Sequence, residues 1–542
     1  MNYGFVIDNR KCIGCHACTV ACKSENDVPV GVNRTWVKYI EKGEYPSTQR
    51  VFSVMRCNHC ADAPCVDICP TKALFTRPDG IVDFDPRRCI GCKACMQACP
   101  YDALYIDPET HTAAKCNYCA HRVDIGLEPA CVIVCPEHAI VSGDLDNPES
   151  GISQLVSREP VTVRKAEKGT EPKLFYINGD EVALNPALAG PEDDYMWSSQ
   201  SGGVGHFARY AEKRVNRRAN DDGDWVGEKG DESSVLVPRD NRPSTMKKAF
   251  DVLKENTKRV YDVPSKGVLW GWPVTAYIWT KAVSTGVFLI MFMGVVLGLA
   301  PVNKATQWSS LWTAFIFLFL TGLLLVKDLD QPRRFLYVLL RPNWSSWLVK
   351  GGYAIFLYGG LLTIVALASA FRWRVVGPLA LWGTAALAVV AAIYTAFLFA
   401  QGRGRDFWQS PILAAHMLLQ SLMAGAGVSL LITWKLPTTP EWDFFLRVVL
   451  QLLIALNILA ITLELFGSHA TADAGSAAHM ITRGRFRILF WSGTVVVGHL
   501  LPVIVLWNAA PALWPVAGIM VLIGIYITDH MWVKAPQLVP LS

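Results

Sequence analysis

The sequence predicts two fold classes joined in one chain, a cysteine-rich α+β domain followed by an all-α bundle of eight transmembrane helices. Three observations predict this organisation. All 16 cysteines of the 542 residues lie between positions 12 and 135, eight long apolar stretches follow residue 270, and 51% of the residues are hydrophobic. This composition is too apolar for an ordinary soluble enzyme. We expect a domain at 1–195, a linker or docking strap at 196–265 and a membrane domain at 266–542.

The cysteines form four quartets, each of which closes with a three-residue gap. The quartets are Cys12, Cys15, Cys18 and Cys22; Cys57, Cys60, Cys65 and Cys69; Cys89, Cys92, Cys95 and Cys99; and Cys116, Cys119, Cys131 and Cys135. The first and third have the C-x₂-C-x₂-C-x₃-C spacing of bacterial ferredoxins, in which three thiolates bind one cubane and the fourth binds another. Proline follows the last cysteine of three quartets. The pattern predicts a double ferredoxin-like iron–sulfur domain with four [4Fe–4S] clusters.

An internal repeat supports the duplication, because Cys12-Ile13-Gly14-Cys15-His16-Ala17-Cys18 returns as Cys89-Ile90-Gly91-Cys92-Lys93-Ala94-Cys95. Two alternatives compete with this prediction. Paired C-x₂-C motifs also suit zinc, but zinc needs neither the fourth cysteine at this gap nor the proline. A disulfide framework is typical of short secreted chains, and residues 1–8 contain neither the apolar core of a signal peptide nor a twin-arginine pair.

Residues 1–195 resemble the four-cluster electron-transfer subunit of the dimethyl sulfoxide reductase and polysulfide reductase families. The resemblance is carried above all by Cys57-Asn58-His59-Cys60-Ala61-Asp62-Ala63-Pro64-Cys65. In that family the quartets exchange cysteines between clusters. The resemblance implies four ligand sets: Cys12, Cys15, Cys18 with Cys135; Cys116, Cys119, Cys131 with Cys22; Cys57, Cys60, Cys65 with Cys99; and Cys89, Cys92, Cys95 with Cys69.

The segment that joins the two halves, 144–265, has no cysteine and is rich in Gly, Asp, Arg and Ser. Such a composition builds no core of its own. It predicts either a free linker or a strap that becomes ordered against a partner subunit. The apolar run at 173–177 indicates that its first part packs on the cysteine domain.

The membrane half contains apolar stretches at approximately 274–300, 310–326, 347–370, 376–401, 408–433, 444–466, 486–508 and 512–533. Each is long enough to cross a bilayer as a helix, at about 20 residues per span. The connections on the side of the cysteine domain carry 15 Lys and Arg, and the opposite side carries 5. The positive-inside rule therefore predicts a multi-pass protein of the inner (cytoplasmic) membrane whose iron–sulfur domain faces the cytoplasm. Clusters on the periplasmic side remain the alternative if a partner carries the export signal.

Ionisable side chains within the spans gather in the half nearest the cysteine domain, where the sequence places Asp529, His530 and the quinone or proton candidates Lys281, Asp328, Tyr394, His416 and Glu464. Charges in hydrocarbon usually mark a cavity or a proton path. A hydrophobic redox substrate that exchanges protons, a quinone or quinol, fits such a site. The structural alternatives are ion pairs of Asp328 and Glu464 with Arg333, Arg334 or Lys281, and a packing role for Tyr394. No pair of histidines on paired spans marks a haem site, so no haem is expected.

The membrane half also resembles a known family, the NrfD-type membrane anchors, which include the membrane subunit of polysulfide reductase. The resemblance lies in residues 325–335, in Arg341-Pro342-Asn343-Trp344 and in residues 532–542, and it departs at Asp330-Gln331, where the family more often has glycine. It implies an eight-span, haem-free architecture that reacts with quinone.

Together the two resemblances imply an electron-transfer and anchor subunit. It would link a large catalytic partner, which carries molybdenum or tungsten bis-pterin, to the quinone pool. The complex would be a membrane-bound oxidoreductase, and this chain would be a subunit of it that lacks the catalytic centre. Two alternatives are a redox-driven ion translocator and a subunit of a quinol-oxidising complex that feeds cytochromes. The formal charge is only +5 and no nucleic-acid motif accompanies it, so no nucleic acid partner is expected.

Overall fold

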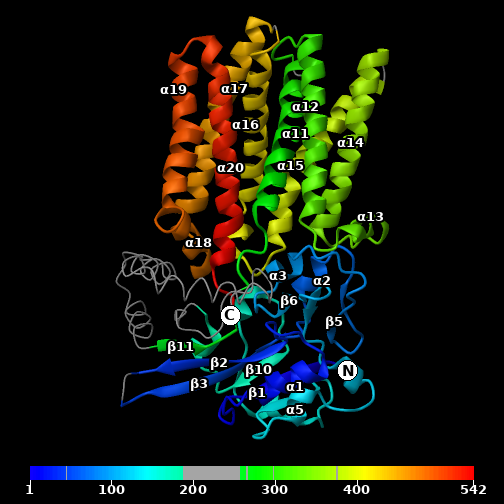
Figure 1. Cartoon of the computed structure of the whole chain (residues 1–542), viewed down its shortest axis with the longest axis vertical. Coiled ribbons are helices and arrows are strands. Elements are labelled where there is room, and N and C mark those ends of the chain that lie inside the picture. The colour runs from blue at the N-terminus through cyan, green and yellow to red at the C-terminus, as the bar shows by residue number, and fades with distance from the viewer. Residues whose placement is uncertain (44–45, 187–256, 264–265, 297, 374–375, 437) are drawn as a thin grey trace. The chain divides into compact units, whose positions relative to one another are not determined.

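The computed structural model describes residues 1–43, 46–186, 257–263, 266–296, 298–373, 376–436 and 438–542 (Figure 1). The chain divides into two compact units. Unit 1 comprises Met1–Leu269, Gly402–Arg405 and Gln537–Ser542, and unit 2 comprises Trp270–Gln401 and Asp406–Pro536. Most of the expected linker, 196–256 and 264–265, lies outside the described residues.

The central sheet of unit 1 has four strands in the order β8-β1-β10-β9. Strand β1 (Tyr3–Asp8) pairs in parallel with β10 (Leu174–Ile177) and antiparallel with β8 (Ile140–Asp144), while β9 (Val161–Thr162) pairs with β10. Phe5 and Ile7 of β1 pack in the main core, and Val6 packs on the opposite face with Ile152 of α6 (Gly151–Arg158). Because both faces are covered, β1 is a continuous apolar run.

The cysteine quartets alternate with short helices and hairpins. Cysteines lie on α1 (Ala17–Glu25), α2 (Pro64–Asp67), α3 (Ala94–Ala98) and α5 (Ala130–Ile133), and Cys119 precedes α4 (Ala120–Val123). The hairpin β4 (Leu74–Thr76) to β5 (Val82–Phe84) follows the second quartet, and β6 (Leu104–Ile106) to β7 (Ala113–Lys115) follows the third. The repeated motifs share backbone geometry, with left-handed φ of 72° at Gly14 and 61° at His16, and of 69° at Gly91 and 60° at Lys93. Glycine suits the first of these positions because it adopts positive φ without strain.

A second sheet contains β11 (Thr257–Tyr261), β2 (Thr35–Lys42) and β3 (Gln49–Arg56) in that order, with α7 (Glu181–Leu184) packed against β2 and β3. Strand β11 falls in the segment expected to be a linker. It is held there because the carboxylate of Asp262 accepts a hydrogen bond of 2.9 Å from Trp36 Nε1 and lies 3.3 Å from the guanidinium of Arg259. The end of that segment is therefore an edge strand of unit 1.

Two segments far away in the sequence complete unit 1. Gln97 Nε2 donates to Gln537 Oε1 at 2.7 Å, and Arg405 donates to Gln97 Oε1 at 3.1 Å and to the carbonyl oxygen of Val539 at 2.5 Å. Arg164 donates to the carbonyl oxygen of Leu541 at 3.2 Å. The fold of unit 1 thus uses residues that are synthesised before and after those of unit 2.

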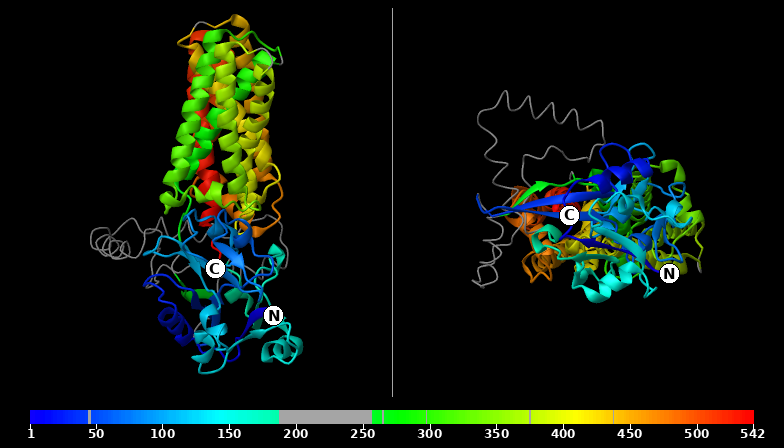
Figure 2. Two further views of the ribbon diagram at one scale, coloured as in Figure 1. Left: turned by 90° about the vertical axis from the view of Figure 1, so that its right-hand side faces the viewer. Right: turned by 90° about the horizontal axis from the view of Figure 1, so that it is seen from below.

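Among its described residues, unit 2 contains eight helices long and apolar enough to span a membrane, which confirms the number expected from the sequence. They run side by side (Figure 1, Figure 2) and are α11 (Trp272–Val296), α12 (Lys304–Lys327), α14 (Trp347–Phe371), α15 (Val376–Ala400), α16 (Leu413–Thr433), α17 (Pro440–Phe466), the pair of the π-helix Leu489–Leu500 with α19 (Leu501–Asn508), and α20 (Trp514–Leu538). Two short helices, α13 (Tyr337–Leu340) and α18 (Ala472–Thr482), lie in connections.

Helix packing in unit 2 depends on close contacts between glycines. A Cβ atom added to Gly286 of α11 would lie 1.7 Å from the carbonyl oxygen of Ser421 on α16, and one added to Gly425 of α16 would lie 2.1 Å from the carbonyl carbon of Gly286. Gly427 and Gly518, and likewise Gly498 and Gly524, approach each other in the same way. Small residues let membrane helices approach closely and gain van der Waals contact.

Gly286→Ala should therefore separate α11 from α16. Overpacking of this kind costs about 1–3 kcal/mol, so the variant should melt at a lower temperature in mild detergent than the unaltered protein. Gly322→Ala on α12 is the matched control, because a Cβ atom there meets nothing within 4 Å. Equal melting temperatures for the two variants would contradict the close contact.

Candidate functional site

The structure gathers the cysteine thiols of unit 1 into groups that mix the quartets. One cavity is lined by Cys22 together with Cys116, Cys119 and Cys131, which we call the Cys22 group. A second cavity is lined by Cys69 together with Cys89, Cys92 and Cys95, the Cys69 group. In each group the closing cysteine of one quartet joins three cysteines of another.

The remaining thiols form two further groups. Burial raises the pKa of the Cys65 thiol, and its neighbours Cys99, Cys57 and Cys60 raise it further, so these four thiols lie together as the Cys99 group. Burial also raises the pKa of Cys12, and the nearby thiols of Cys135 and Cys15 raise it further; Cys12 acts in the same way on Cys18. We call Cys12, Cys15, Cys18 and Cys135 the Cys135 group.

Polar groups around these thiols fit an anionic cluster. Asn26 Nδ2 lies 3.8 Å from Cys22 Sγ and 3.6 Å from Cys119 Sγ, and the backbone N–H of Gly91 donates to Cys89 Sγ at 3.4 Å. The buried atoms Thr19 Oγ1 and Asn58 Nδ2 have no hydrogen-bond partner among the described residues, although each stands directly beside a cysteine in the sequence. Donors of this kind bond to the sulfurs of iron–sulfur clusters and tune them.

Four thiols around one cavity suit a cubane, whose irons stand at separate corners. Within the part of the chain that the structure describes, no three His, Cys, Asp or Glu side chains converge on a point where one metal ion could bind.

Burial raises the pKa of Cys18, Cys60 and Cys116 to about 12 each. Without iron these thiols are therefore protonated at neutral pH. Iron binds the thiolate, so ligation must release these protons. Cluster binding and the stability of this domain are consequently coupled.

The four groups differ in exposure. Every thiol of the Cys22 and Cys99 groups is buried, whereas Cys15 is exposed and Cys12 and Cys135 are half-buried. Apolar side chains beside these cysteines are also exposed, with Ile13 at 54% and Ile133 at 54% of their full surface. The Cys135 group is thus the group with an exposed ligand, and it has an apolar rim.

In unit 2, Lys281 of α11 is buried against α15. Its Nζ donates to the carbonyl oxygen of Ala392 at 3.2 Å and to Thr395 Oγ1, and it lies 4.4 Å from the centroid of the Tyr394 ring. The Tyr394 ring packs against α14 at Gly351, where a Cβ atom would lie 2.1 Å from it. Tyr394 therefore has the packing role that the sequence analysis gave as an alternative, and its ring also contacts Lys281.

A second polar pair links α16 and α17. His416 Nδ1 lies 2.7 Å from Glu464 Oε2, which also accepts a hydrogen bond of 2.9 Å from Trp532 Nε1 of α20. Both side chains of the pair are 1% exposed, and His416 Nε2 has no hydrogen-bond partner among the described residues. Glu464 is thus paired with a histidine instead of Lys281 or an arginine.

Asp529 of α20 connects the two pairs. Its buried carboxyl lies within electrostatic range of both His416 and Lys281 and beside Gln420. Asp328 lies at the end of α12, and Tyr277 is within electrostatic range of both Asp328 and Tyr394. Lys281, Tyr394, Asp529, His416 and Glu464 all lie toward the end of the bundle where α11 begins and α20 ends. One end of unit 2 therefore contains a set of buried titratable side chains that lie near one another.

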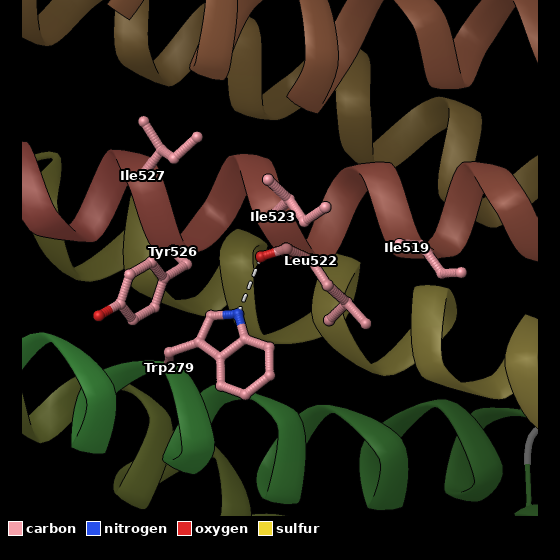
Figure 3. Close-up of a pocket in the computed structure, with 6 residues that line it drawn as sticks. All are labelled: Trp279, Ile519, Leu522, Ile523, Tyr526 and Ile527. Carbon is pink, nitrogen blue, oxygen red and sulfur yellow. Dashed lines mark hydrogen bonds between the residues drawn. The ribbon is translucent and has the colours of Figure 1, made fainter. Parts of the chain in front are cut away.

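A pocket of about 310 Å³ opens between α11 and α20 one helical turn from Asp529. Figure 3 shows Tyr526 beside Trp279, whose indole N–H donates to the carbonyl oxygen of Leu522 at 2.9 Å. The other lining residues are apolar: Ile519, Ile523 and Ile527. A larger pocket of about 560 Å³ lies between α12 and α14, but Thr363 is its one lining residue with a side-chain hydroxyl, so it brings no proton-exchanging group.

Sequence reasoning missed several of these residues. Gln420 did not stand out, and Trp532 was noted only as part of the 532–542 resemblance. Neither is ionisable, and each becomes a partner only when helices distant in sequence pack together. Arg56 and Lys115 were also missed, although both are buried among the thiols and each directly precedes a cysteine. That adjacency is the signal that could have found them.

Known protein families match both units. The family described as polysulphide reductase, NrfD matches residues 263–539, about half of the chain, and two models described as 4Fe-4S dicluster domain match residues 11–74 and 48–145. The chain therefore belongs to the NrfD polysulphide reductase family, fused to a dicluster iron–sulfur domain.

Relatives of the iron–sulfur domain agree. The chain is 44% identical over 200 residues to a subunit of the tetrathionate reductase of Salmonella typhimurium, covering 36% of this chain and 79% of that protein. It is 43% identical over 180 residues to a polysulfide reductase chain from Wolinella succinogenes, covering 32% of this chain and 93% of that protein. It is 35% identical over 227 residues to the arsenate respiratory reductase iron-sulfur subunit ArrB of a Shewanella species, covering 33% of this chain and 96% of that protein. The chain therefore unites an iron–sulfur electron-transfer domain with a multi-pass NrfD membrane anchor, a combination that occurs in membrane reductase complexes.

The exchange of cysteines between quartets can be tested by iron content. Cys69→Ala and Cys95→Ala alter one group, so their combination should lose no more than the iron of one cluster, about four atoms. Cys69→Ala combined with Cys60→Ala alters two groups and should lose about twice as much. If this second pair lost only one cluster, Cys69 would instead belong with its own quartet.

Proposed function

We propose that this chain carries electrons between a separate catalytic subunit and quinone in the membrane, through four [4Fe–4S] clusters held by the Cys135, Cys22, Cys99 and Cys69 groups. The observation that carries the proposal is that the 16 cysteines lie near one another in four sets of four. Each set provides the four thiolates that one cubane requires. The clusters supply one-electron transfer, and the chain's own residues position and shield them.

The catalytic partner is proposed to be a large subunit with molybdenum or tungsten bis-pterin. The names of the relatives support a partner, since they are subunits of reductases for tetrathionate, polysulfide and arsenate. We place the contact with this partner at the Cys135 group. Its exposed Cys15 and apolar rim at Ile13 and Ile133 suit electron exchange across a protein interface, since the other groups are more deeply buried.

The quinone site is proposed at the connected polar groups of unit 2. Reduction of a quinone to quinol takes two electrons and two protons, so the site needs groups that hold and donate protons. The pair of His416 and Glu464 and the carboxyl of Asp529 provide them, while the ammonium of Lys281 stabilises negative charge on a quinone oxygen. The apolar pocket at Trp279 and Tyr526 would receive the isoprenoid tail from the lipid. Asp328 is proposed as a proton-exchanging group at the rim.

The orientation follows from connectivity and charge. Because the cysteine domain precedes α11, we expect it on the side of the membrane where α11 begins, and the connections on that side are the ones rich in Lys and Arg. We therefore propose an inner membrane protein whose clusters face the cytoplasm.

One observation favours a second function, redox-driven ion translocation. His499 lies in the π-helix between Thr494, whose carbonyl oxygen is 2.7 Å from Nδ1, and Asn457, whose Oδ1 is 2.9 Å from Nε2. π-Helical segments are rare and often occur at functional sites. This buried polar pair would extend a proton path beyond the quinone site.

Anoxic purification in mild detergent tests the proposal as a whole. We expect a large partner polypeptide by mass spectrometry, molybdenum or tungsten by elemental analysis, and about 16 irons per chain, as four cubanes require. Haem-bearing partners without molybdenum or tungsten would instead assign the chain to a quinol-oxidising complex that feeds cytochromes.

Glu464→Gln tests the quinone site. Loss of a proton-exchanging group should slow quinol-coupled turnover by about tenfold or more, because acid–base catalysis contributes about 10²–10⁴-fold. The iron content should stay unchanged. Glu441→Gln is the matched control, since Glu441 is an exposed glutamate in the first turn of the same helix. Equal turnover in both variants would return the His416–Glu464 pair to a purely structural role.

A further inference from the structure

Arg56 is a fully buried cation at the end of β3, inside the iron–sulfur domain. Its side chain is 0% exposed, lines the cavity of the Cys22 group and donates from Nη1 to Cys131 Sγ at 3.2 Å. The guanidinium also lies 4.5 Å from the centroid of the Phe5 ring. Arg56 is thus held in place by contacts with both an aromatic ring and a thiol.

The guanidinium of Arg56 lies among the cysteine side chains that line this cavity. Its Nε and Nη2 atoms have no hydrogen-bond partner among the described residues. A buried cation with unpaired donors is strongly unfavourable unless an anion lies beside it. A thiolate-ligated cluster in the adjacent cavity is such an anion.

We propose that Arg56 raises the reduction potential of the cluster in the Cys22 group, through its hydrogen bond to Cys131 and its fixed positive charge. Reduction adds one negative charge to a buried cluster, and a nearby cation stabilises the reduced form more than the oxidised form. Hydrogen bonds to the ligand sulfurs act in the same direction. This inference rests on the proposed ligation of that group.

Lys115 occupies the equivalent position at the Cys99 group. It is buried at the end of β7, its Nζ lies 3.6 Å from Cys57 Sγ, and it donates to the carbonyl oxygen of Cys116 at 2.8 Å and to that of Val82. Every quartet begins directly after a basic residue, namely Lys11, Arg56, Arg88 and Lys115. Arg56 and Lys115 are the two of these whose cations contact a buried thiol, whereas Arg88 is 46% exposed and pairs with Asp85.

Redox titration followed by electron paramagnetic resonance tests the proposal on the full chain purified with its partner. The signal of the Cys22 group is assigned as the one lost in Cys116→Ala. In Arg56→Gln the oxidised-to-reduced ratio of that cluster at a fixed potential should rise roughly tenfold, as expected for a lost hydrogen bond to a charged group. This ratio corresponds to a fall of about 59 mV in the midpoint potential. Lys115→Gln should lower the midpoint of the Cys99 group. Arg88→Gln, the matched control, should leave all midpoints nearly unchanged.

An unchanged midpoint in Arg56→Gln with iron retained, or an equal shift of all four signals, would overturn the proposal. If Arg56→Gln loses iron, Arg56→Lys is titrated instead. The lysine keeps the charge but lacks the planar fork, so a smaller fall confined to the same signal supports the proposal, and no fall overturns it. If Cys116→Ala removes no single signal, the proposed ligation fails, which is a separate result from the shift caused by Arg56.

Discussion

The exchange of cysteines between quartets is the constraint on which the iron–sulfur domain depends. Cys22 lies with Cys116, Cys119 and Cys131, so no segment of the sequence completes a site alone. The hairpins between the quartets are only three residues per strand, too short to be stable in isolation. Most of the cysteine thiols are buried where the protonated form is favoured, and metal ligation reverses this preference. Tertiary structure and cluster sites are therefore formed together.

Both units contain buried cations, but these cations face different chemical groups. In the iron–sulfur domain the buried cations Arg56 and Lys115 face sulfur, so their charge acts on electrons. In the membrane unit the buried cation Lys281 faces a hydroxyl, a carbonyl group and an aromatic ring, with Asp529 nearby. Under the proposed function, the cations of the iron–sulfur domain would act on electron transfer, and the titratable groups of the membrane unit would serve proton exchange.

Much of this organisation could be predicted from the sequence, because its signals are local. Cysteine spacing identified the iron–sulfur domain, and hydropathy identified eight spans whose bounds differ from the observed helices by a few residues. The contacts of Glu464 could not be predicted, since Trp532 and His416 approach it from two other helices. Strand β11 was hidden by the polar composition around it, and its pairing with β2 depends on Trp36, more than 200 residues away. Long-range pairing of this kind leaves no periodic trace in a sequence.

The participation of residues Gln537–Ser542 in unit 1 has a consequence for biogenesis. A ribosome releases these residues only after all eight membrane helices have been translated, although the quartets have emerged long before. Gln97 and Arg164 can form their hydrogen bonds to Gln537 and Leu541 only after those residues have been translated. The nascent iron–sulfur domain therefore lacks these contacts while the membrane helices are inserted, and a truncation within α20 would remove contacts that this domain uses.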